Sequence, residues 1–306
     1  MRKINRWLMV CVCALFSLTG CYNTEPRESV LKIYYENNAE QKIMFDNFPI
    51  VIQKPETLFD ASWSYTSESG NGRNTITSFY KDIVEKSVTL SVFADSKKEY
   101  DEVMDNLHQI TEKDILDKKP GKLFVNGYYL ECFITQKNFS DYEEMFYAVE
   151  IKINIIAENP FWIKKSEYYF DASESLSTDN KKYAYRYAYR YANGMRNRSI
   201  MNSYIKACNF ELKIFGSVLN PQIIIGGYEY LINDYLENGE YIIVDSLKRT
   251  VTKIMNDGTA VNIFDSREKK RSVFQKIRSG RSLISWSGKF DFMLTLYEER
   301  AEPQWH

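Results

Sequence analysis

The chain has 306 residues, of which 44% are hydrophobic and 26% are charged. This composition is typical of folded globular proteins, and the length allows two domains with separate cores. The formal net charge is -1, so the charge of the whole molecule does not favour nucleic-acid binding. The aromatic fraction of 15% favours strands, because large rings suit pleated, half-buried surfaces. We therefore expect sheets to outweigh helices.

The beginning of the chain has the pattern of an export signal. Three basic residues precede an apolar run over residues 7–18 that is too short to span a bilayer. The string Leu-Thr-Gly-Cys then ends at Cys21 and resembles the lipobox of bacterial lipoproteins. This resemblance implies lipidation of Cys21, and attachment to a membrane through that residue only.

The next part, residues 30–165, has the pattern of a mixed unit of strands and one helix. Residues 88–92 alternate as a strand, and Ser96 with Glu99 then forms a capping box that predicts the start of a helix. Apolar residues recur at helical spacing over residues 100–110, which predicts that the helix packs on the sheet.

Two turn signals lie within the same unit. Asn126 and Gly127 separate two apolar runs, and this dipeptide is the strongest short-range signal for a tight hairpin. Residues 67–74 contain Gly70 and Gly72 among polar residues, without the rest of a phosphate-binding fingerprint. We interpret this second segment as a flexible polar loop.

A break follows a strand near the middle of the chain. Residues 149–155 alternate apolar and polar side chains, and Pro160 then removes a hydrogen-bond donor from the sheet. We interpret residues 166–208 as a linker. Within it five tyrosines alternate with alanine and arginine, which predicts an extended segment. Such a row either stacks on bases or sugars or, as is more common, docks a connector onto a neighbouring domain. The five are Tyr183, Tyr185, Tyr187, Tyr189 and Tyr191.

The second half, residues 209–306, consists of short apolar runs between turn signals. Gly227, Gly239 and Gly258 each follow glycine, asparagine or aspartate, at positions where turns need positive φ. No stripe of helical period competes with the runs, so the pattern predicts an antiparallel sandwich. The predicted strands span residues 210–214, 223–225, 240–244, 250–254, 283–286 and 290–296.

Residue types that carry chemistry are sparse. His108 and His306 are the two histidines, and neither has a metal-ligand partner at a usable spacing. Signatures of a nucleophile elbow, a phosphate loop or a zinc cluster are absent, so we expect no enzyme, no metal and no cofactor. A pair of acids that meet only in the fold would leave no trace in the sequence. Cys132 alternates with Leu130 and Ile134, which indicates a small core residue.

Basic residues gather near position 270 and are interrupted only by Glu268. They could meet phosphate or an acidic partner, but such runs are more often solvated loops and strand edges. Because the net charge is close to zero, we expect no nucleic-acid partner. The basic residues are Arg267, Lys269, Lys270, Arg271, Lys276, Arg278 and Arg281.

Five strings occur in a characteristic order between residues 30 and 306. They are KIYYEN at 32–37, the stretch 120–134 around GKLFVNGYYL, ENPFWI at 158–163, the tyrosine repeat, and EPQW at 302–305. In this order they resemble the distal tail proteins (Dit) of phages with siphovirus-type tails. The resemblance implies a mainly β fold with minor α. It comprises a ring-forming domain with one helix at 30–165 and a galectin-like or carbohydrate-module-like antiparallel β-sandwich at 209–306.

The same resemblance implies a function and partners. Distal tail proteins are structural parts of the virion that assemble in the host cytoplasm as a homohexameric ring at the end of the tail tube. The resemblance thus implies contact with the tail tube protein, the tail tip or tail-associated protein and a receptor-binding protein, with carbohydrate as a further ligand. We therefore expect a phage or prophage baseplate hub rather than an enzyme.

The N-terminal signal departs from this family, because tail proteins have no use for export. Either the start is mis-assigned and Val30 is the initiator, or the signal is genuine and lipidated Cys21 anchors a surface protein at the outer face of a bacterial membrane. That lipoprotein would bind carbohydrate or protein with its sandwich, through the tyrosine row or Trp286. Trp286 alternates with Ile284, which favours a core position. The tail function is preferred, because the resemblance spans nearly all of the mature chain whereas the signal indicates only a destination.

Overall fold

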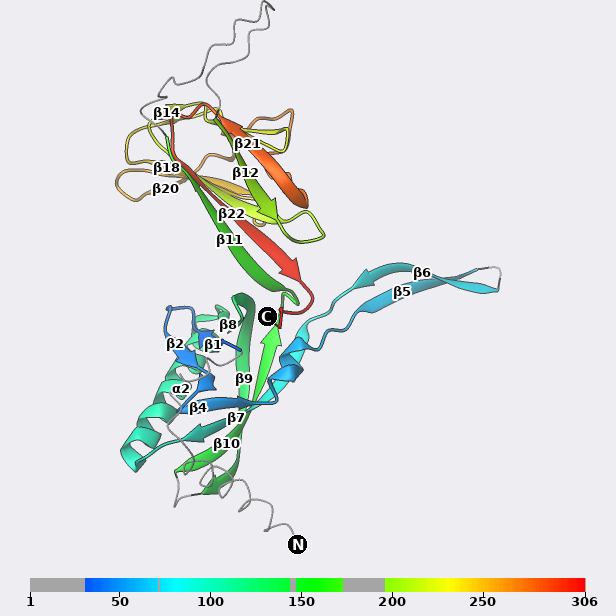
Figure 1. Ribbon diagram of the computed structural model, residues 1–306, viewed down its shortest axis with the longest axis vertical. Helices are drawn as coiled ribbons and strands as arrows, with labels where there is room; N and C mark the ends of the chain where they lie inside the picture. The colour runs from blue at the N-terminus through cyan, green and yellow to red at the C-terminus, as the bar shows by residue number, and fades with distance from the viewer. Residues whose placement is uncertain (1–30, 71, 144–146, 173–195, 306) are drawn as a thin grey trace, which may run out of the picture.

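The structure is a computed structural model that describes residues 31–70, 72–143, 147–172 and 196–305. Two β-rich units lie one above the other along the long axis, and a two-stranded arm projects sideways between them (Figure 1). The described helical elements are the helix α2 (Lys97–Asp117) and the 3-10 turns η2 (Pro55–Phe59) and η4 (Phe264–Ser266). The expected mainly β fold with minor α is confirmed.

The first unit is a sheet whose strands alternate between a buried and an outer side. Strands β3, β4, β7, β10 and β9 lie side by side in this order, and β8, β1 and β2 continue from β9. In β10, Val149, Ile151 and Ile153 are buried and the residues between them are not, as the sequence predicts. The strands are β1 (Ile33–Glu36), β2 (Lys42–Met44), β3 (Asp46–Asn47), β4 (Ile50–Gln53), β7 (Val84–Phe93), β8 (Gly121–Val125), β9 (Tyr128–Glu143) and β10 (Ala148–Ala157).

Helix α2 packs on this core and begins at the predicted cap. The Ser96 hydroxyl accepts a hydrogen bond from the N–H of Glu99 at 3.2 Å. The reciprocal bond differs from a capping box, because the Glu99 carboxylate accepts from the N–H of Asp95 at 2.9 Å and not from that of Ser96. Leu107 and Ile110 are buried, and the apolar residues of the preceding turns are half-buried against the same core.

The predicted hairpin joins β8 to β9. Asn126 and Gly127 have φ values of 49° and 80°, which are the two positive values that a type I′ turn requires. Val125 and Tyr128 pair across the turn. The Asn126 side chain also accepts a hydrogen bond from the N–H of Lys32 at 3.0 Å. The turn therefore connects β9 to the beginning of the described chain.

The second unit is a sandwich of two antiparallel sheets. One sheet has the order β11, β22, β13, β18, β19, β20, and the other has the order β12, β21, β15, β16. Aromatic rings fill the space between them: Phe170 stacks on Phe292 at 4.5 Å between ring centroids, and Trp286 meets both rings edge-on. Trp286 is fully buried, so its predicted core position is confirmed.

The strands of the sandwich and two short ones beside it follow the seam at Pro160. They are β11 (Trp162–Phe170), β12 (Arg196–Asn202), β13 (Asn209–Phe215), β14 (Val218–Leu219), β15 (Gln222–Ile225), β16 (Tyr228–Leu231), β17 (Tyr235–Leu236), β18 (Tyr241–Asp245), β19 (Thr250–Ile254), β20 (Ala260–Asn262), β21 (Gly280–Trp286) and β22 (Phe292–Arg300). Each of the six strands predicted in this half has a counterpart among them.

The sequence interpretation of residues 166–208 as a linker differs from the structure at both ends. The range contains most of β11 and all of β12, and Phe170 and Ile200 are buried in the second core. Pro160 ends one sheet segment as expected, but the chain starts a new strand only two residues later. This was missed because the outer side of β11 is polar and no turn signal separates the strand from the following residues.

The interpretation of residues 67–74 as a loop is also wrong. Residues 67–70 and 72–74 belong to the arm, which consists of β5 (Ser64–Gly70) and β6 (Arg73–Tyr80). The two strands pair along their whole length, with a bulge opposite the step from Thr66 to Ser67. Because neither face of the arm is buried, its sequence lacks the apolar alternation that identifies other strands.

Candidate interaction surfaces

The arm of β5 and β6 extends away from both cores (Figure 1). All of β6, and β5 after Ser64, are exposed. Among the described strands these two pair only with each other, so each presents a free edge. A two-stranded hairpin alone is marginally stable in water, and free edges readily pair with other strands. The arm therefore has the properties of a segment that a partner completes.

Large apolar side chains are exposed along the arm. Tyr65 and Phe79 face each other across the two strands at 6.5 Å between ring centroids, and Phe79 is 63% exposed. Single exposed apolar residues are normal, but this group lies on a segment without a core of its own. The remaining members are Trp63, Ile76, Tyr80 and Ile83. The arm is thus a contact surface rather than a spacer.

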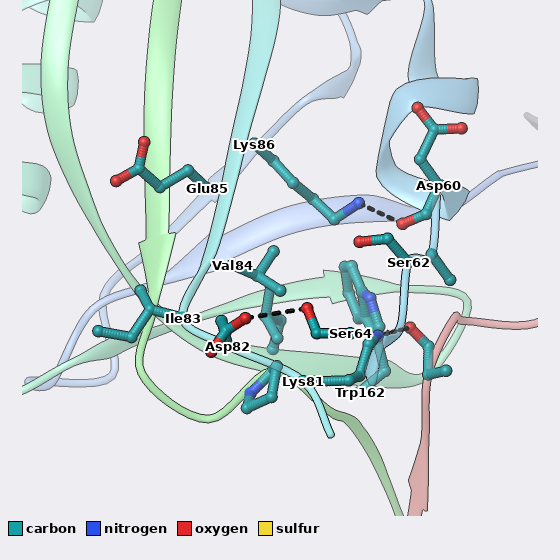
Figure 2. A pocket seen from close by; sticks show the side chains of 14 residues that line it. Asp60, Ser62, Ser64, Lys81, Asp82, Ile83, Val84, Glu85, Lys86 and Trp162 are labelled. Carbon is teal, nitrogen blue, oxygen red and sulfur yellow. Dashed lines mark hydrogen bonds between the residues drawn. The ribbon is translucent and has the colours of Figure 1, made fainter. Parts of the chain in front are cut away.

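Two lysines fix the base of the arm to neighbouring segments. The Lys81 ammonium donates to the carbonyl of Ala301 at 3.2 Å, and the Lys86 ammonium donates to that of Asp60 at 2.8 Å. Both lysines and Trp162 line a cavity of about 370 Å³ (Figure 2). Burial lowers the pKa of both lysines. Because their donors point at backbone carbonyls, this cavity is a joint between segments.

Residues 301–305, which we call the strap, lead from β22 back onto the first unit. Trp305 stacks on Phe59 with 3.7 Å between ring centroids and 10° between the ring planes. The side-chain amide of Asn126 donates to the carbonyls of Gln304 at 3.1 Å and Trp305 at 3.0 Å. Since Phe59 and Asn126 belong to the first unit, the strap ties the sandwich to it.

Strands β9 and β11 connect the two units at a narrow waist. Their pairing consists of Tyr129 with Ile163 and Tyr128 with Lys164. The Lys164 ammonium and the Arg300 guanidinium each lie 5.5 Å from the centre of the Tyr128 ring. Arg300 also donates to the Tyr128 hydroxyl at 3.0 Å. Tyr128 is therefore the centre of the waist, since groups from both units converge on it.

The residues singled out by sequence are not brought together in one place. Cys21, the tyrosine repeat at 183–192 and His306 lie outside the described residues. Cys132 is buried in the first core, and burial raises the pKa of its thiol to about 12, which makes it unreactive. His108 lies on the exposed side of α2, with Nε2 at 2.8 Å from a Glu112 carboxylate oxygen. Trp286 is inaccessible to a sugar.

Within the part of the chain that the structure describes, no group of three or more His, Cys, Asp or Glu side chains is placed to hold a metal ion. In the same residues, no helix has both the length and the apolar character needed to cross a membrane. The features that stand out are surfaces for contact. Sequence reasoning missed the arm, because it carries neither a chemical motif nor a buried face. It singled out residues 302–305 of the strap as a string but did not predict their contact with the first unit.

Solved structures of phage tail proteins share this fold. The Dit protein of phage SPP1, described as a paradigm of the hub adsorption apparatus in phages that infect Gram-positive hosts, matches with a TM-score of 0.53 at 9% identity over 88% of this chain and 99% of that chain. The phage P2 baseplate in its activated conformation with Ca matches with a TM-score of 0.58 at 13% identity over 89% and 99%. Its Sr form gives 0.57 at 14% identity over the same shares. No family model and no curated protein sequence matches the chain.

These likenesses extend over both units, because they cover 88% or 89% of this chain and 99% of each solved chain. They show that this chain has the fold of tail hub and baseplate proteins. The fold expected from the resemblance in sequence is therefore confirmed.

Proposed function

We propose that this protein is a distal tail protein of a phage or prophage with a siphovirus-type tail, where it forms the hub that joins the tail tube to the tip. A fold alone supports many functions. The observation that carries the proposal is that the likeness to hub and baseplate chains covers 99% of each of them, so that two different units occur in the same order. The role is structural.

The ring is a homohexamer, and the arm closes it. A closed ring needs a heterologous interface, in which one patch of each copy meets a different patch of the next copy. The arm supplies the first patch through its free strand edges and Phe79. The second patch is the edge of the first unit at β3 and β4, where Phe48 and Val51 are exposed.

The remaining partners follow from the position of each unit. The first units form the ring, so its two faces meet the tail tube protein and the tail tip or tail-associated protein. The sandwich lies at the far end of the molecule, joins the first unit through the waist and the strap, and is free to carry a receptor-binding protein (Figure 1). Assembly takes place in the host cytoplasm, and the product is part of the virion tail.

Purified phage particles provide the test. Tryptic mass spectrometry of the tail fraction should recover peptides from residues 31–306, and negative-stain microscopy of the isolated protein with its tail tube protein should show six-fold rings. The N-terminal peptide identifies the residue at which the protein in the particle begins. A peptide that starts at position 30 supports the mis-assigned start.

The lipoprotein alternative makes the opposite prediction. It requires a protein that fractionates with membranes, carries an acyl group on Cys21 and is absent from particles. Recovery in the membrane fraction with that modification, and no rings in the presence of tail tube protein, would rule out the tail function.

A further inference from the structure

A second cavity, of about 340 Å³, lies on the sandwich at the turn between β15 and β16. It is lined by Tyr228 and Tyr230 of β16, by Ser282 of β21 and by the segment 275–278, which we call its wall. This volume is near the lower limit of ligand pockets, about 300 to 1,000 Å³. The cavity therefore accommodates one small ring-shaped group rather than an extended chain.

Hydrogen bonds hold the wall of this cavity in place. The Tyr230 hydroxyl donates to the carbonyl of Gln275 at 2.7 Å, and the Tyr228 hydroxyl donates to that of Ser272 at 3.0 Å. On the other side, the Arg278 guanidinium donates to the carbonyl of Gly226 at 2.9 Å. Because both tyrosine hydroxyls are used in this way, their rings are fixed before any ligand arrives. A preformed site loses less entropy on binding.

The charged side chains at the cavity are all positive. Lys276 and Arg278 line it, and the Arg271 guanidinium lies 5.9 Å from the centre of the Tyr228 ring. No carboxylate lines the cavity. Within the described residues none of these three cations forms a salt bridge, whereas other lysines of the sandwich do. Part of the cluster that looked like a solvated loop in the sequence thus lies at a cavity, and its positive charge there is not compensated by a salt bridge among the described residues.

The side chains that line the cavity indicate which class of ligand it binds. The half-buried Tyr228 ring offers a face for the C–H side of a sugar, and the buried Tyr230 ring packs against it at 5.2 Å between ring centroids. Ser282 with Gln275 offers hydrogen-bond partners for the hydroxyl groups of the sugar. The cations require a negative charge on the same group. The rings of Tyr228 and Tyr230 are inclined by 62°, so they do not form a parallel slot for a base. We propose that this cavity binds one acidic sugar unit, a saccharide that carries a phosphate or a carboxylate.

The proposal concerns the sandwich only and does not depend on the ring. It replaces Trp286 as the carbohydrate-binding residue, because Trp286 is buried. The test titrates the full chain with five probes, followed by isothermal titration calorimetry. The probes are glucose 6-phosphate, glucuronate, glucose, inorganic phosphate and adenosine 5′-monophosphate. We expect one or both acidic sugars to bind about tenfold more tightly than glucose or phosphate alone, since each lacks one class of contact.

Two double variants with the same change of charge separate a site from general attraction. Lys276→Gln with Arg271→Gln removes cations at the cavity, and Lys269→Gln with Lys270→Gln removes cations of the same cluster away from it. All four side chains are exposed, so both variants should fold. We expect the first variant to lose about tenfold or more in affinity and the second to retain it.

Several results would overturn the proposal. They are no binding of either acidic sugar, equal binding of inorganic phosphate, tighter binding of adenosine 5′-monophosphate, or an equal loss in the two double variants. An equal loss would identify the cluster as a diffuse positive surface. If glucose 6-phosphate binds and glucuronate does not, the site is specific for phosphate-bearing sugars.

Discussion

Tyr35 and Asp114 link the helix of the first unit to its sheet through buried hydrogen bonds. The Tyr35 hydroxyl donates to one carboxylate oxygen of Asp114 at 2.6 Å, and the N–H of Asn38 donates to the other at 2.7 Å. Gly121 makes room for them, because a Cβ there would lie 2.3 Å from the Tyr35 oxygen and 2.4 Å from a carboxylate oxygen of Asp114. Any larger residue at position 121 would displace this pair.

The Asp114 carboxyl should make the stability of the protein depend on pH. Burial raises its pKa, although the hydrogen bonds from Asn38 and Tyr35 oppose the rise. The folded state therefore binds this proton more tightly than the unfolded state. The group stabilises the fold most below the ordinary aspartate pKa, and this contribution is lost as the pH rises through the raised value. Asp114→Asn keeps the shape and removes the titration.

We expect urea denaturation between about pH 4 and pH 7 to show a smaller fall in the free energy of unfolding for Asp114→Asn than for the parent. Asp117→Asn is the matched control at the same end of the helix. Hydrogen bonding to Lys113 lowers the pKa of Asp117, so this group changes the stability mainly below about pH 4, and its removal should leave the slope between pH 4 and pH 7 nearly unchanged. Identical slopes for parent and Asp114→Asn would show that this carboxyl does not titrate on unfolding.

Gly127 permits a second prediction for a single residue. No side chain lies within 4 Å of where its Cβ would be, so Gly127→Val tests only the backbone, which has a φ of 80° there. A β-branched residue resists this conformation, and the cost should be about 1 to 3 kcal/mol of the free energy of unfolding. Gly72→Val, at a φ of 73° in the turn of the arm, is the control. Because the arm has no core, its variant should melt like the parent.

At the scale of elements, the arm is the test of the proposed ring. The double change Ile76→Ser and Phe79→Ser removes exposed apolar surface without touching either core. We expect it to abolish the ring in light scattering while the melting temperature stays within about a degree of the parent, as for other surface changes. Leu116→Ser, which alters an exposed leucine on α2, should leave the ring intact. Rings of normal size in the arm variant would place the contact elsewhere.

Elements that bury one side could be predicted from the sequence. Each of these elements has a local sequence pattern that determines its backbone. The pattern is a cap for helix α2, an alternation for strand β10 and a dipeptide for the turn at Asn126. Strands β5 and β6 carry none, because no face of the arm is buried within one copy. The interaction surfaces are harder to predict from the sequence than the elements. The cavity beside Tyr228 joins residues 225–230 to residues 275–282, and only the sheet order brings them together.

For the whole molecule, the strap decides how firmly the two units are held. Trp305 is 46% exposed, yet its ring stacks on Phe59. We expect Trp305→Ala to lower the free energy of unfolding by about 1 kcal/mol, as for other aromatic pairs. Hydrogen exchange should become faster at residues 55–59 and 126–128 and stay unchanged in the sandwich. Met201→Ala, an exposed truncation on the sandwich, is the control.

If residues 55–59 exchange at the parent rate in Trp305→Ala, the strap lies on the first unit without stabilising it. Faster exchange throughout the chain would instead indicate that the units unfold together. Only a local effect fits the waist as described, where the sheet contact between the units consists of two residue pairs.

The strap also imposes an order on synthesis. A ribosome makes Phe59 long before it makes Trp305, and domains generally fold as units while translation continues. Each nascent chain therefore passes through a stage in which the first core and the arm are present, but Trp305 does not yet cover Phe59. At this stage the contacts of Arg300 with Tyr128 at the waist have not formed either. Two such chains on one messenger could meet through their arms before either has its final shape. The relative orientation of the units becomes fixed only in chains that have reached residue 305.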